Sequence, residues 1–384
     1  GMPPAEANHT LMFCFLGTSL SRYFKTNLED AALAIQTGIL ANKNRVVFFR
    51  QESATAGYIG ELCHNVNGGE CVELRIKDVS LDKSAITPET IGEILAQMAE
   101  VAPAKRYGAV FAGHGQGWIT REALNRDKGV EKFGVSYNPW LVAAGAEQTR
   151  AFGENNVQLN IDELATGIES SGVGLDYILF DACFMSNIEA IYDLRNSANY
   201  IIASPCEIMG KGFPYHRTLP YLFTDYGEST DYDGAARSYH EYYKSEYVGN
   251  GRCGSITVYK CSEIEALADA VRVVMQSAKK RTEYDNSTLQ TYEGQKYHQF
   301  YDFGEWVNVV ATDSNALNSF SSKLDECIMA TYTLETFYSA YGTYGTYPIN
   351  LDVYSGVTTS APSDAYTGEW KTTNWYNEVI ALEN

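Results

Sequence analysis

Short apolar runs, separated by stretches with helical patterning, constrain this chain more than any other feature of its sequence. The runs are nearly continuously apolar, as in strands that are buried on both faces of a parallel sheet. The expected strands are 11–16, 45–49, 72–76, 108–112, 177–180, 200–203 and 255–259. The expected helices between them are 27–41, 88–101, 160–170, 187–194, 234–246 and 262–278. This alternation predicts an α/β fold, a doubly wound sandwich with a mostly parallel sheet covered by helices on both faces.

Two segments depart from this alternation. Residues 119–158 contain no convincing strand and mix basic residues with glycine, asparagine and proline. A connection this long in a compact domain is usually functional or disordered. After about residue 281 the sequence becomes rich in tyrosine and threonine. Helical patterns in this last part lie at 305–311 and 316–332. We expect a main domain over 1–280 and a small C-terminal subdomain over 281–384 that packs on the sheet.

Composition and charge exclude several classes of protein. A hydrophobic fraction of 45% over 384 residues is enough for a buried core. The formal net charge of -19 argues against nucleic acid as a partner, because phosphate binding needs clustered lysine and arginine. An acidic surface suits cationic peptides, although plain solubility explains it equally well. The eight cysteines form no pair of the C-x-x-C type, and the six histidines have no zinc-like spacing with them, so a metal site has little support.

The sequence contains no apolar stretch that predicts a signal peptide or a transmembrane segment. Gly1, Met2, Pro3 and Pro4 have the character of a cloning remnant joined to a trimmed start, so any export signal lies outside this sequence. Cys63 and Cys71 flank a turn-like run of asparagine and glycine. They form a disulfide across a hairpin if the protein is exported, or stay reduced and buried; cysteine usage leaves both readings open.

Cys183 follows directly after one of the apolar runs, in Tyr177-Ile178-Leu179-Phe180-Asp181-Ala182-Cys183. This places the thiol just past the carboxyl end of a parallel strand, where open α/β sheets form their binding crevices. We expect the thiol to be accessible and close to a helix N-terminus, which favours the thiolate. The alternative is a structural cysteine buried beneath a turn.

His114 occupies a similar position in Phe111-Ala112-Gly113-His114-Gly115. An apolar strand again ends in a glycine-rich turn, and the flanking glycines leave the imidazole unshielded. If the two strands are parallel neighbours, both turns lie at the same edge of the sheet. Cys183 and His114 then meet across a cleft, as a nucleophile and its general acid do. The other cysteines and histidines have no comparable setting.

The two runs together, Gly113-His114-Gly115-Gln116-Gly117-Trp118 and Asp181-Ala182-Cys183-Phe184-Met185, resemble the clostripain family of cysteine peptidases, relatives of caspases, gingipains, legumains and separase. The resemblance extends through Gly212-Phe213-Pro214-Tyr215 and covers more than half of the chain. It implies a caspase-like three-layer sandwich and a Cys183-His114 dyad without an essential third carboxylate. It also implies an oxyanion hole made by the backbone N–H groups of Gly115 and Cys183, a kind of donor that contributes about 3 to 4 kcal/mol in other enzymes. Peptide hydrolysis would proceed through a thioester.

Asp181 lies two residues before Cys183 and matches the acidic residue that the family carries there. A carboxylate in a partly dry pocket binds an arginine guanidinium through charge-assisted hydrogen bonds, so we expect cleavage after Arg or Lys. Glu207 is a candidate second acidic group, whereas Lys211 in the same pocket would oppose a basic side chain. The alternative role for Asp181 is to cap the following turn.

The resemblance also implies processing between the histidine and the cysteine. We therefore expect 119–158 to be an exposed activation loop, with Lys128 as the first candidate cleavage site and Arg126 and Arg150 behind it. No cofactor is expected for the chemistry, and a structural calcium ion is allowed. Further expectations are a monomer, peptide or protein substrates, no nucleic acid, no transmembrane segment, and a secreted or cell-surface location in bacteria. The competing readings are an inactive caspase-like binding protein and a transpeptidase using the same dyad.

Overall fold

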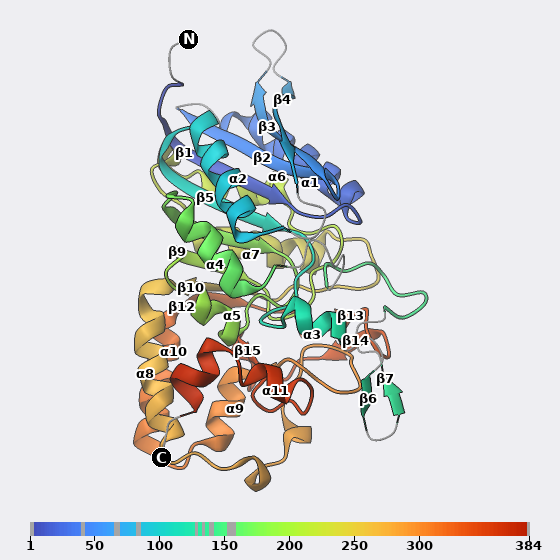
Figure 1. The fold of residues 1–384 in the computed structure, drawn as a ribbon, viewed down its shortest axis with the longest axis vertical. Helices are drawn as coiled ribbons and strands as arrows, with labels where there is room; N and C mark the ends of the chain where they lie inside the picture. Colours follow the sequence, from blue (N-terminus) through green and yellow to red (C-terminus); the bar gives the residue numbers. More distant parts are fainter. Residues whose placement is uncertain are drawn as a thin grey trace.

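Figure 1 shows the computed structural model of the chain, which describes residues 4–39, 43–64, 70–81, 86–126, 130–132, 135–137, 142–151 and 159–381. Nine of its described strands form the central sheet, in the order β12-β10-β9-β8-β5-β1-β2-β3-β4. These strands are β1 (Ala7–Phe15), β2 (Asn44–Ser53), β3 (Ala56–His64), β4 (Cys71–Ser80), β5 (Ala104–Ala112), β8 (Leu175–Asp181), β9 (Ala198–Ala203), β10 (Ile256–Lys260) and β12 (Ile328–Tyr332).

The centre of this sheet is parallel and its two edges are antiparallel. Strands β2, β1, β5, β8 and β9 run in one direction. Strands β3 and β4 continue one edge in antiparallel pairing, and β10 and β12 continue the other. Residues 11–15 of β1, 109–112 of β5 and 177–180 of β8 are buried, as their continuous apolar sequence predicts.

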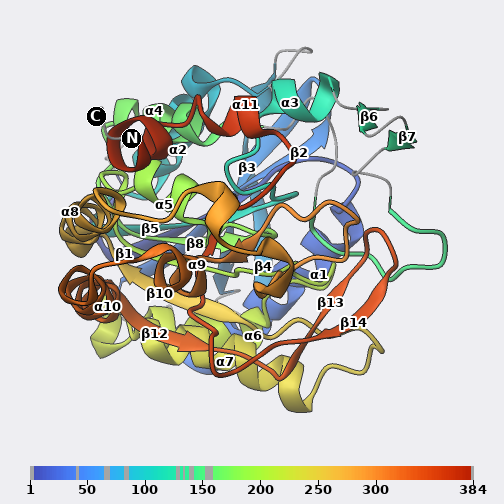
Figure 2. The same ribbon diagram turned by 90° about the horizontal axis from the view of Figure 1, so that it is seen from below.

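Helices cover both faces of the sheet and complete the three layers that the sequence predicts. Helices α2 and α4 lie on one face and α6 and α7 on the opposite face, as Figure 2 shows. Helix α1 packs against α6, and α8 packs against α10. These helices are α1 (Ser21–Ala34), α2 (Pro88–Val101), α4 (Ile161–Ser170), α5 (Ile188–Asp193), α6 (Tyr215–Leu222), α7 (Tyr232–Ser245), α8 (Ile264–Met275) and α10 (Ser314–Cys327).

The structure also contains smaller elements outside the central sheet. The helices among them are α3 (Arg121–Arg126), α9 (Phe303–Val310) and α11 (Thr367–Trp370). The strand pairs are β6 (Val130–Lys132) with β7 (Val135–Tyr137), β11 (Tyr301–Asp302) with β15 (Thr358–Thr359), and β13 (Thr336–Ser339) with β14 (Gly345–Pro348). No helix in the described part of the chain combines the length and the apolar character needed to cross a bilayer.

The structure corrects several of the predicted elements. Strand β3 and helix α6 were not predicted, and α1 begins at Ser21 rather than at residue 27. The helix predicted over 316–332 ends at Cys327, because Ile328–Tyr332 pair with β10 as an edge strand. The C-terminal part of the chain therefore supplies a strand to the central sheet, while a domain boundary near 281 stays a prediction.

Strands β3 and β4 form the hairpin that Cys63 and Cys71 were expected to flank. Cys63 lies opposite Val72 and His64 lies opposite Cys71 in the antiparallel register. Both cysteines are free thiols in this structure. Of the two readings that the sequence left open, the reduced one describes the hairpin as it stands, although the two thiols are only half-buried.

Gly108 fixes how closely β5 approaches β8. It lies opposite Tyr177 in the parallel register, and a Cβ atom added to it would lie 1.9 Å from the Cζ atom of the Tyr177 ring. The Tyr177 hydroxyl is in turn 2.9 Å from Nε2 of the buried His9, so the ring cannot move aside without breaking a buried hydrogen bond.

We predict that Gly108→Ala lowers the free energy of unfolding by about 1 to 3 kcal/mol, because overpacking forces the ring or the backbone to shift. Gly174→Ala is the matched control, since an added Cβ atom there meets nothing within 4 Å. Urea unfolding of both variants measures the difference. Equal midpoints for the two variants would contradict the packing described here.

Candidate active site

The loops that carry His114 and Cys183 are held together by adjacent strands. Strands β5 and β8 are parallel neighbours, as predicted, and Ala112 lies opposite Asp181 at their carboxyl ends. A Cβ atom added to Gly115 would lie 2.1 Å from the carbonyl oxygen and 2.5 Å from the nitrogen of Cys183. Only glycine permits this approach, so the two loops are in backbone contact.

Cys183 is completely buried, contrary to the prediction of an accessible thiol. The backbone N–H of Ile208 donates a hydrogen bond to its Sγ atom at 3.0 Å. Burial, reinforced by the negative charge of Glu207, raises the pKa of the thiol well above its usual range. Helix α5, which follows Cys183 in the chain, begins only at Ile188, so its N-terminus does not lie directly beside the sulfur as predicted. The thiol is therefore neutral in this state of the protein.

His114 is partly exposed and lies between two oxygen atoms. Its Nδ1 atom is 3.1 Å from the carbonyl oxygen of Ala151, and its Nε2 atom is 2.8 Å from the Ser19 hydroxyl. A carbonyl oxygen can only accept a hydrogen bond, so Nδ1 carries a proton and donates a hydrogen bond to the carbonyl oxygen of Ala151. In the uncharged tautomer Nε2 accepts from Ser19, a residue to which no sequence pattern pointed.

Residues 148–151, called here the blocking segment, run across these loops and form isolated β-bridges at Thr149 and Ala151. The Arg150 N–H donates to the Ile208 carbonyl, and the Gly210 N–H donates to the Gln148 carbonyl, each at 2.8 Å. These bonds pair the segment in antiparallel fashion with the chain after β9. This is the way in which extended peptides bind to the edge of a folded protein.

The carbonyl group of Arg150 points into the contact between the two loops. Its oxygen accepts hydrogen bonds from the N–H of Gly115 at 2.7 Å and from the N–H of Cys183 at 3.3 Å. These are the two donors that the sequence resemblance assigns to an oxyanion hole. Because His114 holds the next carbonyl, that of Ala151, the peptide bond between Arg150 and Ala151 lies between the histidine loop and the cysteine loop.

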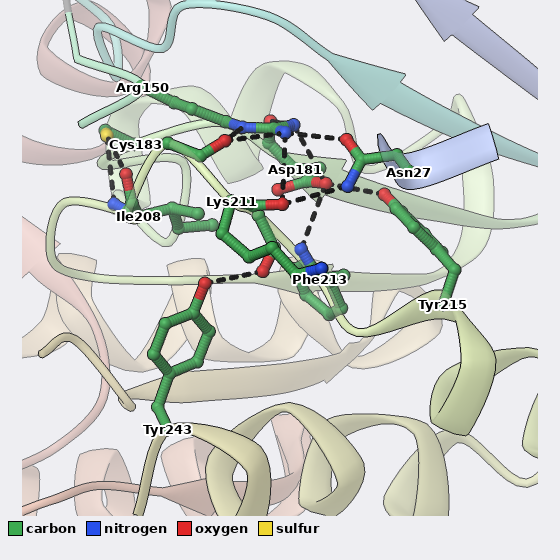
Figure 3. A network of polar contacts seen from close by, with 11 residues as sticks. Asn27, Arg150, Asp181, Cys183, Ile208, Lys211, Phe213, Tyr215 and Tyr243 are labelled. Carbon is green, nitrogen blue, oxygen red and sulfur yellow. Dashed lines mark hydrogen bonds and ion pairs between the residues drawn. The ribbon is translucent and has the colours of Figure 1, made fainter. Parts of the chain in front are cut away.

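The Arg150 side chain is buried among polar groups that together are called here the arginine pocket (Figure 3). Its Nη1 atom forms an ion pair with Oδ2 of Asp181 at 2.9 Å, and both side chains are completely buried. The Gly210 carbonyl accepts from Nε at 3.1 Å and from Nη2 at 3.0 Å. Asn27 Oδ1 accepts from Nη2 at 2.6 Å. Such full pairing is what makes the burial of a guanidinium tolerable.

Asp181 contacts both Arg150 and the chain around Phe213 and Tyr215. Besides Arg150, its Oδ2 atom accepts hydrogen bonds from the Phe213 N–H at 3.2 Å and the Tyr215 hydroxyl at 2.6 Å. Burial raises the pKa of Asp181, while the charge of Arg150 and these donors act to lower it. The carboxylate thus accepts a backbone N–H bond, but from Phe213 in the chain after β9, so the bonds described here do not show the predicted capping of the turn that follows Asp181.

Gly212 closes the pocket from the other side. Its φ of +73° lies in the left-handed region, and an added Cβ atom would lie 2.6 Å from the guanidinium carbon of Arg150 and 2.6 Å from Oδ2 of Asp181. Any side chain here would displace the ion pair. Steric crowding thus explains why the run Gly212-Phe213-Pro214-Tyr215 begins with glycine.

Lys211 does not oppose the bound arginine, contrary to the prediction. Its ammonium group forms an ion pair with Asp30 at 2.8 Å. Its carbonyl oxygen faces the pocket, where it accepts a hydrogen bond from Asn27 Nδ2 at 2.9 Å and a longer one from Arg150 Nη2 at 3.5 Å. The charge of Lys211 is thereby neutralised, and its backbone supports the pocket.

Glu207 lies next to this pocket and contacts a different side chain. It is completely buried, and its Oε1 atom accepts hydrogen bonds from the Thr149 hydroxyl at 2.9 Å and the Ala340 N–H at 3.0 Å. In the blocking segment, Glu207 therefore contacts the side chain of Thr149, the residue before Arg150.

The structure describes the three candidate cleavage residues to different extents. Lys128, the first choice, lies outside the described residues, and of Arg126 the structure describes only the backbone at the end of α3. Arg150 is completely buried, and its neighbours Thr149 and Ala151 are nearly so. The predicted exposure of the 119–158 stretch is therefore wrong at residues 149–151, whereas Gln148 is exposed as predicted. The buried Asp181 carboxylate accounts for the burial of the guanidinium, because the two groups form an ion pair.

Sequence reasoning also missed Asn27, Ser19 and the backbone acceptors of the arginine pocket. Asn27 had a usable signal, because it is a polar residue among Phe24, Leu28 and Ala31 on the buried face of α1. Carbonyl oxygens leave no signal in side-chain identities. No cluster of three or more histidine, cysteine or acidic side chains that could hold a metal ion occurs among the described residues, and structural calcium stays a prediction.

Comparison with known proteins agrees with this geometry. The sequence profile of the clostripain family matches residues 138–364. Among solved structures, the chain is similar to a secreted cysteine protease from Bacteroides thetaiotaomicron, iotapain, with 28% identity, a TM-score of 0.83, and coverage of 98% of this chain and 100% of that one. Comparison with curated proteins gave no match.

Two further solved structures are informative. An inactive zymogen of a protease from Parabacteroides distasonis is 26% identical, with a TM-score of 0.78 and coverage of 98% of this chain and 99% of that one. A clostripain from Bacteroides thetaiotaomicron, in complex with the peptide inhibitor BTN-VLTK-AOMK, is 32% identical, with a TM-score of 0.54 and coverage of 60% of this chain and 100% of that one. The profile match spans more than half of the chain, so this protein belongs to the clostripain family and is a cysteine peptidase.

Proposed function

We propose that this protein is an endopeptidase that cleaves after Arg or Lys, with Cys183 as nucleophile and His114 as acid and base. One observation carries the proposal: the Arg150–Ala151 peptide lies across both loops as a substrate would. Its carbonyl oxygen accepts from Gly115 and Cys183, and its arginine side chain is paired with Asp181. A bound peptide with a basic residue at this position would make the same contacts.

The chemistry follows from these placements. The thiolate of Cys183 attacks the carbonyl carbon of the basic residue, and the N–H groups of Gly115 and Cys183 stabilise the charge that develops on the oxygen. His114, after taking the thiol proton, gives it to the departing amine, which leaves as the new N-terminus. A thioester remains on the sulfur. Water, deprotonated by His114, then hydrolyses the thioester and restores the thiol.

We also propose that the described state is a zymogen that processes itself at Arg150–Ala151. The blocking segment fills the arginine pocket, and the neutral, buried thiol of Cys183 is inactive towards other peptides. The relative from Parabacteroides distasonis is itself an inactive zymogen. Arg150 thereby replaces Lys128 as the first candidate for processing.

The pocket suits arginine better than lysine. Three nitrogen atoms of the Arg150 guanidinium find separate acceptors, whereas a lysine ammonium would leave part of that set unused. Lysine nevertheless occurs in the peptide VLTK of the inhibitor bound to the clostripain relative. Secretion is part of the proposal as well, since iotapain is a secreted protease.

Replacement of either catalytic residue should remove activity. We predict that Cys183→Ala and His114→Ala each lower kcat/KM on an arginine peptide by at least about 1,000-fold, and that the double variant loses little more, because the two side chains act as a unit. Hydrolysis of a fluorogenic peptide measures the loss, with circular dichroism as the check on folding. Turnover above a few per cent in Cys183→Ala would make the protein something other than a Cys183 peptidase, and a folded wild type without turnover would favour the inactive binding protein.

Self-processing should produce one new N-terminus. We predict that wild-type protein, on incubation, yields a fragment beginning at Ala151, and that Cys183→Ala does not. The Arg150→Ala variant should stay intact, whereas Arg126→Ala, the matched control, should be cleaved as wild type is. Mass spectrometry of the fragments decides the matter: cleavage after Lys128, or cleavage of the Cys183→Ala protein, would reject Arg150 as the self-processing site.

Asp181 should control the choice of basic residues. We predict that Asp181→Asn lowers kcat/KM for an arginine peptide by about 100-fold, since a buried guanidinium loses its counter-charge. A peptide with citrulline in place of arginine, which has the same shape without the charge, should lose far less. An equal loss on both peptides, together with a lower melting temperature, would instead reduce Asp181 to its role in holding Phe213 and Tyr215.

A further inference from the structure

The residue that precedes Arg150 in the blocking segment also has a pocket of its own. The Thr149 side chain is 4% exposed, and its hydroxyl donates a hydrogen bond to Oε1 of Glu207 at 2.9 Å. Backbone bonds on either side hold this part of the segment in extended form, so the Thr149 side chain is directed by the same pairing that places Arg150. A substrate bound in this way would present the corresponding side chain to Glu207.

Glu207 is held in place by the protein and has accepting capacity to spare. The N–H of Ala340, just after β13, donates to its Oε1 atom at 3.0 Å. Its Oε2 atom is buried and has no hydrogen-bond partner among the described residues. A buried carboxyl group with so few donors depends strongly on each of them. The Thr149 hydroxyl is one of the few donors to this carboxyl group, beside the Ala340 N–H and the Ser339 hydroxyl.

We infer that Glu207 selects threonine or serine at the substrate position immediately before the basic residue. This inference rests on the proposed function, because residues 148–151 stand in for a substrate. It assigns Glu207 to a second pocket, separate from the arginine pocket in which the sequence had placed it. The two pockets are built from different elements, since Asp181 ends β8 whereas Glu207 lies beyond the end of β9.

The chemistry of the pair explains why a hydroxyl is selected. Valine has the shape of threonine but replaces the hydroxyl with a methyl group, which leaves the buried carboxyl group without that donor. A site built to hydrogen-bond a hydroxyl discriminates against an analogue that lacks it far more strongly than an apolar pocket discriminates by size. The pocket is filled by threonine, so leucine would also need the surrounding chain to move.

Peptides that differ only at this position provide the test. We expect the mature wild-type enzyme to cleave Thr-Arg and Ser-Arg peptides with a kcat/KM about tenfold or more above that of a Val-Arg peptide. In Glu207→Leu the ratio of Thr-Arg to Val-Arg should fall to near one, while the ratio of arginine to citrulline after threonine stays as in wild type. Asp181→Asn should show the reverse pattern.

The chain supplies a second test that leaves Glu207 in place. Self-cleavage at Arg150–Ala151 should be slower in Thr149→Val than in Thr149→Ser by a similar factor, as the rate of appearance of the Ala151 N-terminus measures. Equal rates for Thr-Arg and Val-Arg peptides in wild type, or fastest cleavage of a Lys-Arg peptide, would overturn the role of Glu207 and leave the proposed peptidase intact. Failure to cleave any arginine peptide would overturn both.

Discussion

The buried ion pair between Arg150 and Asp181 is the interaction on which the described state of this site depends. Both side chains are completely buried, 2.9 Å apart. Removing one member of such a pair typically costs about 3 to 5 kcal/mol, because the other charge is left without a partner. Further acceptors for the guanidinium come from Asn27 on α1 and from the Gly210 carbonyl, and the missing side chain of Gly212 leaves room for the ion pair. Helix α1 and the chains that follow β8 and β9 are thereby joined at one guanidinium.

The segment that this ion pair holds in place also contacts the backbone of Cys183. With Arg150 in its pocket, the main chain of the blocking segment occupies the N–H groups of Gly115 and Cys183, and the buried thiol has a raised pKa. In the proposed processing, release of the new Arg150 end from the arginine pocket would admit water and remove the desolvation that raises the pKa of the thiol. His114 and Ser19 already lie beside the peptide, so this proposed activation would require departure of the cut chain and no rearrangement of the sheet.

The sequence was informative where local pattern determines structure. Continuous apolar runs located β5 and β8, and hence the turns that carry His114 and Cys183. Strand β3 was missed because Gly57 and Gly60 interrupt its pattern; added Cβ atoms there would lie within 2.7 Å and 2.4 Å of the Phe49 and Phe48 rings, so both glycines make room for β2. Strand β12 was missed because it continues directly from α10 at the edge of the sheet. Arg150 was misjudged for a different reason: a basic residue in a polar stretch is usually exposed, and only its tertiary partner Asp181 explains its burial.

In the proposed zymogen, Arg150 occupies the place of a substrate and blocks Cys183 until the chain is cut. An irreversible inhibitor that carries arginine next to its reactive group distinguishes blocked from open sites, if its addition to Cys183 is followed by mass spectrometry while wild-type protein processes itself. Intact chains should remain unlabelled, and each labelled molecule should have lost the Arg150–Ala151 bond. Rapid labelling of Cys183 in intact chains would show that Arg150 does not block the site.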